Sequence, residues 1–125
     1  MYQYKARITE IIDGDTFEAS VDLGFQVYFR ERFRLLNYAA PEAKGPEKSL
    51  GLLAKTKLEE LLPIGLEVTM TSKRMEKYGR WLAEVVYGET TLSAYLIKLG
   101  YGFFVKDGAS QPKFDPAQPY PLSQL

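Results

Sequence analysis

Two aspartates on either side of one glycine are the first residues in this chain whose type and spacing suggest chemistry. Asp13, Gly14 and Asp15 separate two runs that have the composition of β-strands. Asp-Gly is a favoured hairpin turn, so a structural turn explains the pair without any ligand. Paired carboxylates also suit a hard cation such as Ca²⁺, but calcium takes roughly six to eight oxygen ligands, and two are too few. Alone, these residues leave both interpretations open.

Arginines and a glutamate further along the chain suggest phosphate chemistry. Arg30, Arg32 and Arg34 alternate along one predicted strand, and Glu42 follows in a loop after Pro41. A row of arginines is usually a solvated face, yet guanidinium groups also match phosphate oxygens two at a time. Glu42 is either an ordinary loop carboxylate or a group that polarises a water molecule. Only a shared location would connect these side chains.

The basic segment KRMEKYGR, residues 73–80, is a third candidate. Its composition fits a soluble hairpin loop. It also fits a phosphate-facing loop with Arg80 aimed inward, to which Lys77 adds positive charge. Tyr78 offers a ring on which a nucleic-acid base can stack.

The composition limits which chemistry these groups can support. The chain has 125 residues and a formal net charge of zero, which predicts one domain and argues against coating nucleic acid by bulk charge. It contains no histidine and no cysteine, so imidazole and thiolate sites are excluded. Carboxylates, Arg, Lys, Tyr and a hard cation remain. No signal peptide and no apolar run of roughly 20 residues is visible, so we expect a cytoplasmic protein that does not enter a membrane.

Three long strands are expected to position the first two groups, over residues 2–12, 16–23 and 25–36. The second and third alternate with a period of two, which places their apolar residues on one face. Those predicted faces contain Phe17, Ala19, Val21 and Leu23 in the second strand and Phe25, Val27, Phe29, Phe33 and Leu35 in the third.

A helix and two more strands are expected after the loop 37–45. Pro46 suits a first helical position, and an apolar stripe continues to Pro63. Strands are predicted over 66–72 and 80–87, then a short helix over 92–99 and an extended piece over 103–105. The stripe of the first helix consists of Leu50, Leu53, Ala54, Leu58, Leu61 and Leu62.

Five strands with a helix between the third and fourth predict a mainly β, α+β architecture: a five-stranded OB-fold barrel with a short helix after the fifth strand. We assign this domain to residues 1–106. Residues 107–125 form a proline-rich tail without periodicity, in which we predict no secondary structure and leave open whether it packs on the barrel. A fold of this kind does not by itself give a function.

The order and spacing of the motifs resemble the staphylococcal nuclease-like, or thermonuclease-like, domain family from about Ile8 to Phe104. The matching segments are IDGDT at 12–16, FRLL at 33–36, PE at 41–42, GPE at 45–47, KYGR at 77–80 and LGYG at 99–102.

This resemblance implies a nuclease that hydrolyses phosphodiester bonds of DNA and RNA with Ca²⁺. It implies that Asp15 is a calcium ligand, with Asp13 close to the metal and the backbone carbonyl of Ala40 contributing. Glu42 is implied as the general base, or as the group that orients the attacking water.

The same resemblance implies that Arg34 and Arg80 bind the scissile phosphate and offset the charge that grows on it. Arg32, Lys77 and Tyr78 are the expected contacts to the rest of the nucleic acid. We expect a monomer with DNA or RNA as its partner.

One departure from the family pattern concerns the metal. The family has a second aspartate ligand where this chain has Ala39, in NYAAPE. A methyl group cannot coordinate, so calcium is expected to bind weakly unless Asn37 or Asp13 compensates.

Three functions therefore stay open: a metal-dependent nuclease, an OB-fold module that binds single-stranded nucleic acid without cutting it, and a protein-interaction domain on the same fold. A steep salt dependence of oligonucleotide binding would separate the second from the third.

Overall fold

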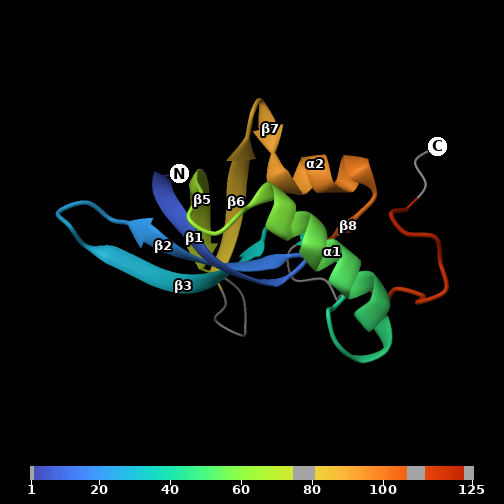
Figure 1. The fold of residues 1–125 in the computed structure, drawn as a ribbon. Coiled ribbons are helices and arrows are strands. Elements are labelled where there is room, and N and C mark those ends of the chain that lie inside the picture. Colours follow the sequence, from blue (N-terminus) through green and yellow to red (C-terminus); the bar gives the residue numbers. More distant parts are fainter. Residues whose placement is uncertain (1, 75–80, 107–111, 123–125) are drawn as a thin grey trace.

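A computed structural model describes residues 2–74, 81–106 and 112–122. Figure 1 shows the order of the elements along the chain. The strands are β1 (Gln3–Asp13), β2 (Thr16–Asp22), β3 (Tyr28–Leu35), β4 (Tyr38–Ala39), β5 (Glu67–Arg74), β6 (Trp81–Tyr87), β7 (Thr90–Thr91) and β8 (Phe103–Phe104). The helices are α1 (Lys48–Leu61), which follows one 3₁₀ turn at Gly45–Glu47, and α2 (Leu92–Leu99).

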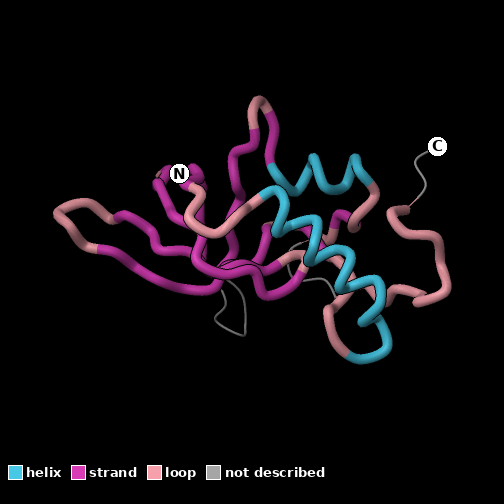
Figure 2. Tube along the Cα trace, viewed as in Figure 1, coloured by secondary structure: helices cyan, strands magenta, loops and turns pink. Residues whose placement is uncertain are grey.

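Five strands close into a barrel, which confirms the predicted OB-type architecture. β1 pairs with β2 and β5, β2 pairs with β3, and β5 pairs with β6, all antiparallel. Parallel pairing of β3 with β6, from Phe33–Trp81 to Leu35–Ala83, closes the ring. Figure 2 shows the strands as one curved wall with the two helices beside it.

Alternation along the strands fills the barrel, as the period-two pattern predicts. Phe17 and Phe33 face each other across β2 and β3, with ring centroids 5.9 Å apart. Both are buried, and so is Met70 on β5. The interior is therefore dominated by large apolar side chains.

The start of the third strand differs from the prediction. β3 begins at Tyr28 rather than Phe25, because residues 24–27 form a turn in which the Val27 N–H donates to the Gly24 carbonyl. Phe25 and Gln26 both adopt positive φ, at 56° and 63°, which a strand does not allow. The expected core positions Phe25, Val27 and Leu23 are exposed instead.

Helix α1 packs against the β1–β2 turn through its buried face. Leu50, Ala54 and Leu58 are buried, but the predicted stripe residue Leu53 is 52 % exposed. Gly14 lets α1 approach the turn closely, because a Cβ added there would lie 2.5 Å from the Ala54 Cβ. We call this region, comprising residues 13–15 and 38–43 against α1, the α1 end of the barrel.

The short helix α2 has the predicted boundaries. The Thr91 hydroxyl accepts a hydrogen bond from the Ala94 N–H at 3.2 Å, and Gly100 ends the helix in a left-handed conformation with φ 86°. In the part of the chain that the structure describes, neither helix is long and apolar enough to cross a membrane.

Candidate functional site

The IDGDT motif forms the predicted turn between β1 and β2, and it lies at the α1 end. Asp13 ends β1 and pairs with Thr16 at the start of β2. The Asp15 carbonyl accepts a hydrogen bond from the Leu35 N–H at 2.9 Å, which fixes the turn against the end of β3. The turn interpretation of this motif is therefore confirmed.

The Asp15 side chain is buried and accepts hydrogen bonds on both oxygens. Its Oδ1 accepts from the Thr16 hydroxyl at 2.9 Å, and its Oδ2 accepts from the Ala40 N–H at 3.2 Å. The Arg34 Nη2 lies 3.8 Å from Oδ2. A carboxylate has about four acceptor positions, so these two hydrogen bonds use half of them.

Burial raises the pKa of the Asp15 carboxyl above its ordinary value of 3.8. The Arg34 charge and the hydrogen bonds from Ala40 and Thr16 lower this pKa, while the charge on Asp13 raises it. Because the raising effects dominate, the ionised carboxylate is incompletely compensated by the surrounding protein. A cation beside Asp15 would favour its ionised form.

Arg34 is the arginine of β3 that points into the site. Its side chain is only 14 % exposed, and Nη2 also donates to the Tyr38 carbonyl at 3.4 Å. Arg30, on the same face of β3, instead pairs with Glu18 at 2.7 Å with its side chain 66 % exposed. The structure thus separates one partly buried arginine from its solvated neighbours.

The loop that carries Glu42 is tied to the aspartate turn on both sides of that residue. The Ala40 N–H donates to Asp15, and the Ala43 N–H donates to Asp13 Oδ1 at 3.2 Å. Glu42 itself is exposed, and its N–H donates to the Glu47 Oε1 at 3.2 Å. The motif residues at positions 13, 15 and 42 are therefore brought together by backbone contacts.

Gly51 on α1 allows this loop to approach the helix. A Cβ added at Gly51 would overlap the carbonyl group of Glu42. The glycine therefore sets how closely the Glu42 backbone lies to α1. In this way the packing of the helix influences the position of Glu42.

The loop is also held in place by its pairing with β8. Tyr38 and Ala39 pair with Phe104 and Phe103, an antiparallel contact of β4 with β8 that the sequence prediction missed. An added Cβ at Gly102 would meet the Ala39 carbonyl, so only glycine permits this approach.

Residues 112–122 in turn pack on β8 and on the end of α2. Phe114 is buried and stacks on Phe103, with ring centroids 5.2 Å apart. The Tyr120 hydroxyl donates to the Tyr101 carbonyl at 2.7 Å, and the Leu122 N–H donates to the Gly100 carbonyl at 2.7 Å. We call residues 112–122 the C-terminal strap. It supports β8, which pairs with the loop beside Asp15.

Tyr38 is a residue of this region that sequence reasoning overlooked. It is almost completely buried, and among the side chains that the structure describes its hydroxyl has no hydrogen-bond partner. Burial raises the pKa of this hydroxyl, with smaller contributions from Tyr120 and Asp15, so it stays protonated. Its position before two alanines gave no signal in the sequence.

Of the other residues predicted to bind phosphate or the rest of the nucleic acid, the structure describes only Arg32. Arg32 is exposed on β3 and lies opposite Glu18 on β2. Lys77, Tyr78 and Arg80 lie outside the described residues.

The donors present fit a hard cation held in large part by water. Asp15 and Asp13 offer carboxylate oxygens, and Ala40 offers a backbone carbonyl, all suited to Ca²⁺. Ala39, which stands where the family resemblance implies a second aspartate, is buried and offers only a methyl group. Within residues 2–74, 81–106 and 112–122, no three acidic side chains are grouped closely enough to hold a metal.

Comparison of the sequence with models of protein families identifies the family of this chain. The sequence model of the family described as Staphylococcal nuclease homologue matches residues 32–119. The chain belongs to this family. The matched segment includes Arg34, Glu42 and Arg80 but begins after Asp13 and Asp15. A nuclease-like fold of a family that acts on nucleic acid is thereby established. The comparison with curated proteins found no relative that matches.

Proposed function

We propose that this protein is a metal-dependent nuclease that hydrolyses phosphodiester bonds of DNA or RNA as a monomer. The observation that carries the proposal is the buried Asp15 carboxylate held beside Arg34 and joined by the Ala40 N–H to the loop of Glu42. The closeness of Asp15 to Arg34 and to the loop of Glu42 supports the assignment of these residues as cation ligand, phosphate ligand and base. Family membership supports the same function.

Asp15 and Asp13, with the Ala40 carbonyl, would hold a Ca²⁺ ion, which when bound polarises a phosphoryl oxygen. The hydrogen bonds from Thr16 and Ala40 keep the Asp15 carboxylate in one orientation. A preorganised ligand avoids the cost of ordering the side chain when the cation arrives.

Arg34 and Arg80 would bind the oxygens of the scissile phosphate. The Arg34 guanidinium is restrained by Asp15 and by the Tyr38 carbonyl, so its donors have a fixed direction. Donors that are fixed where negative charge develops stabilise the transition state more than mobile ones.

Glu42 would accept a proton from the attacking water. The water oxygen bonds to phosphorus, the bond from phosphorus to the leaving oxygen breaks, and that oxygen is protonated by solvent. Glu42 then returns its proton to solvent. Its exposed side chain on a doubly anchored loop suits this exchange.

Ala39 favours a second candidate function, binding of single-stranded nucleic acid without cleavage. Its buried methyl removes one anionic ligand, and fewer ligand charges weaken calcium binding. Arg34 and Arg32 would still provide contacts to phosphate in such a module.

Cleavage of single-stranded DNA in millimolar Ca²⁺, compared with the same reaction in chelator, tests the proposal. Glu42→Ala removes the candidate base, and Glu59→Ala removes an exposed carboxylate of α1 as the matched control. We expect metal-dependent cleavage by the wild type and by Glu59→Ala, with little or none by Glu42→Ala. Equal cleavage by all three proteins would contradict the proposal. Binding without cleavage by all three would favour the second function.

A further inference from the structure

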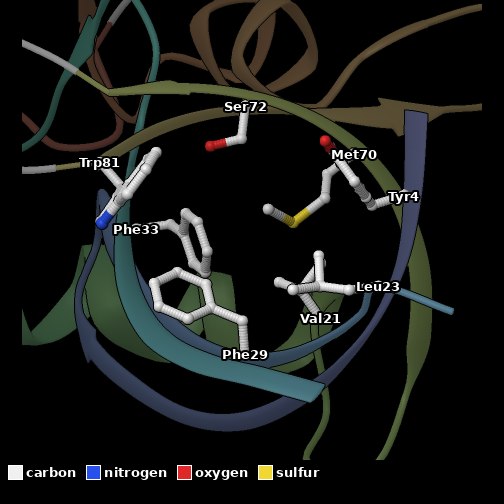
Figure 3. Close-up of a pocket in the computed structure, with 8 residues that line it drawn as sticks. All are labelled: Tyr4, Val21, Leu23, Phe29, Phe33, Met70, Ser72 and Trp81. Atoms are coloured by element: carbon white, nitrogen blue, oxygen red, sulfur yellow. The ribbon is translucent and has the colours of Figure 1, made fainter. Parts of the chain in front are cut away.

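The barrel contains a cavity at a different place from the aspartate turn. Its volume is about 290 Å³, and Figure 3 shows its side chains arranged around a central space. We call this cavity the mouth. Its lining consists of Tyr4, Val21, Leu23, Phe29, Phe33, Met70, Ser72 and Trp81.

The lining defines the chemistry that the mouth can accept. Among the residues that the structure describes, the eight lining side chains carry no charge, so they would not compensate a phosphate or a metal ion. Phe29 and Trp81 meet edge to face with ring centroids 5.7 Å apart. The Ser72 hydroxyl donates to the Leu82 carbonyl at 2.9 Å and keeps its acceptor capacity. A flat, neutral ring with a few polar atoms suits this surface.

The size of the mouth agrees with one heteroaromatic ring system. A dry apolar cavity of about 150 Å³ is known to take benzene, and the mouth is about 290 Å³. A pyrimidine or purine base therefore fits, whereas a folded peptide segment does not. The rim is accessible because Tyr4, Phe29 and Trp81 are only half-buried and Leu23 is 47 % exposed.

Strand β3 connects the mouth with the candidate site. Phe29 and Phe33 point into the barrel, while Arg32 and Arg34 lie on the opposite face of the same strand. In the described residues, β3 pairs with β6 only from Phe33 onward, so the first half of β3 borders the mouth.

The separation between the two places sets a length for any ligand that reaches both. Arg34 lies five residues after Phe29, which is roughly 17 Å along a strand. A single strand of nucleic acid that is stacked at about 3.4 Å per nucleotide covers this distance with about five nucleotides, and an extended one with fewer.

We propose that the mouth is a base-binding pocket, which takes one unpaired base of the strand whose phosphate lies at Arg34. The proposal rests on the proposed nuclease function. Phosphates at Arg34 and Arg32 would guide the strand along β3, and the base would stack against Phe29 and Trp81. Duplex DNA has no unpaired base to offer, so the mouth would favour single-stranded substrates.

Trp81 makes the proposal measurable, because it is the only tryptophan in the chain. Thymidine oligonucleotides of two to eight nucleotides are titrated in chelator while Trp81 fluorescence and affinity are recorded. We expect fluorescence to change, and affinity to rise, once the oligonucleotide reaches about five nucleotides.

Two variants at the mouth and one control locate the effect. Phe29→Ala removes a stacking ring, Val21→Phe fills the cavity, and Phe25→Ala removes an exposed ring outside it. We expect the first two to weaken binding of the eight-nucleotide strand by about tenfold or more and to leave the two-nucleotide strand unchanged. Phe29→Ala removes volume whereas Val21→Phe adds it, so a folding defect in one variant is not expected in the other, and the folded variant still tests the pocket.

Several results would overturn the proposal. Metal-dependent cleavage with silent Trp81 fluorescence and wild-type affinity in both mouth variants would leave the nuclease function standing and remove the pocket. Absence of any oligonucleotide binding or cleavage would remove both. A fluorescence change that follows protein concentration without oligonucleotide would instead assign the mouth to a contact between two copies of this chain.

Discussion

The two ends of β3 lie in chemically different surroundings although they belong to one strand. At its last residues, Arg34 lies partly buried beside Asp15, and backbone hydrogen bonds tie the turn and the Glu42 loop together. At its first residues, Phe29 lines an uncharged cavity, and the preceding turn is exposed. The α1 end is polar and tightly supported, whereas the mouth is apolar and open.

This difference shows how a small barrel can hold a polar site without weakening its core. The charged groups of the α1 end lie at strand ends and in loops, where backbone N–H groups of Ala40 and Ala43 donate to Asp15 and Asp13. The buried rings of Phe17 and Phe33 lie inside the barrel. A buried carboxylate that is only partly compensated, such as Asp15, is typical of a site that binds something.

The largest predicted effect concerns the arginine of the α1 end. Arg34→Lys keeps the positive charge but loses the planar fork that fits a phosphate, so we expect kcat to fall by roughly 100- to 1000-fold. Arg30→Lys, on the same strand but exposed, is the control and should retain activity. Single-turnover cleavage assays compare the two. Equal losses would mean that β3 contributes only bulk charge and that the two arginines are not distinct.

The second prediction tests whether the strap supports the α1 end. Phe114→Ala removes a buried ring that stacks on Phe103, so we expect a loss of about 3 kcal/mol in the free energy of unfolding. Calcium affinity should fall as well, because β8 pairs with the loop beside Asp15. Urea unfolding and calcium titration measure both, and the oligonucleotide-induced change in Trp81 fluorescence should persist. Loss of stability with unchanged calcium affinity would separate the strap from the site.

The third prediction uses the raised pKa of Asp15. A folded protein with such a carboxyl binds more protons than the unfolded chain, so its stability falls as pH rises from about 3.8 to the raised pKa. Asp15→Asn does not titrate, and its unfolding free energy should lack this fall. Urea unfolding from pH 3 to 8 measures the difference, and millimolar Ca²⁺ should reduce it because a cation favours the ionised carboxylate. Parallel stability profiles of the two proteins would contradict the prediction.

The smallest effect is expected near the mouth, at the exposed turn. Phe25 and Gln26 have the positive φ values that Asn-Gly adopts readily in a type I′ turn. The double variant Phe25→Asn with Gln26→Gly should therefore stabilise the protein by up to about 1 kcal/mol and leave cleavage unchanged. The urea midpoint measures this gain. Destabilisation would show that Phe25 makes contacts in solution.

The sequence predicted the barrel and the turn at Asp13–Asp15 because alternation and Asp-Gly turns are local signals. It extended β3 to Phe25 because the alternation continues through a turn whose positive φ values fall on residues other than glycine. It missed the β4–β8 contact because two-residue strands have no detectable period. The motif spacing indicated Arg34 and Glu42, but which N–H groups anchor their loop depends on tertiary contacts that spacing does not encode.

The central claim is that the α1 end is a cation and phosphate site that lacks one ligand. The most direct test compares calcium binding by the wild type and by Ala39→Asp. Position 39 is buried, so an added carboxylate should destabilise the protein in chelator. We predict that millimolar Ca²⁺ reverses this loss and binds Ala39→Asp at least tenfold more tightly than the wild type, measured by calorimetric titration and thermal unfolding. A variant that stays destabilised in Ca²⁺, with no gain in affinity, would contradict the account.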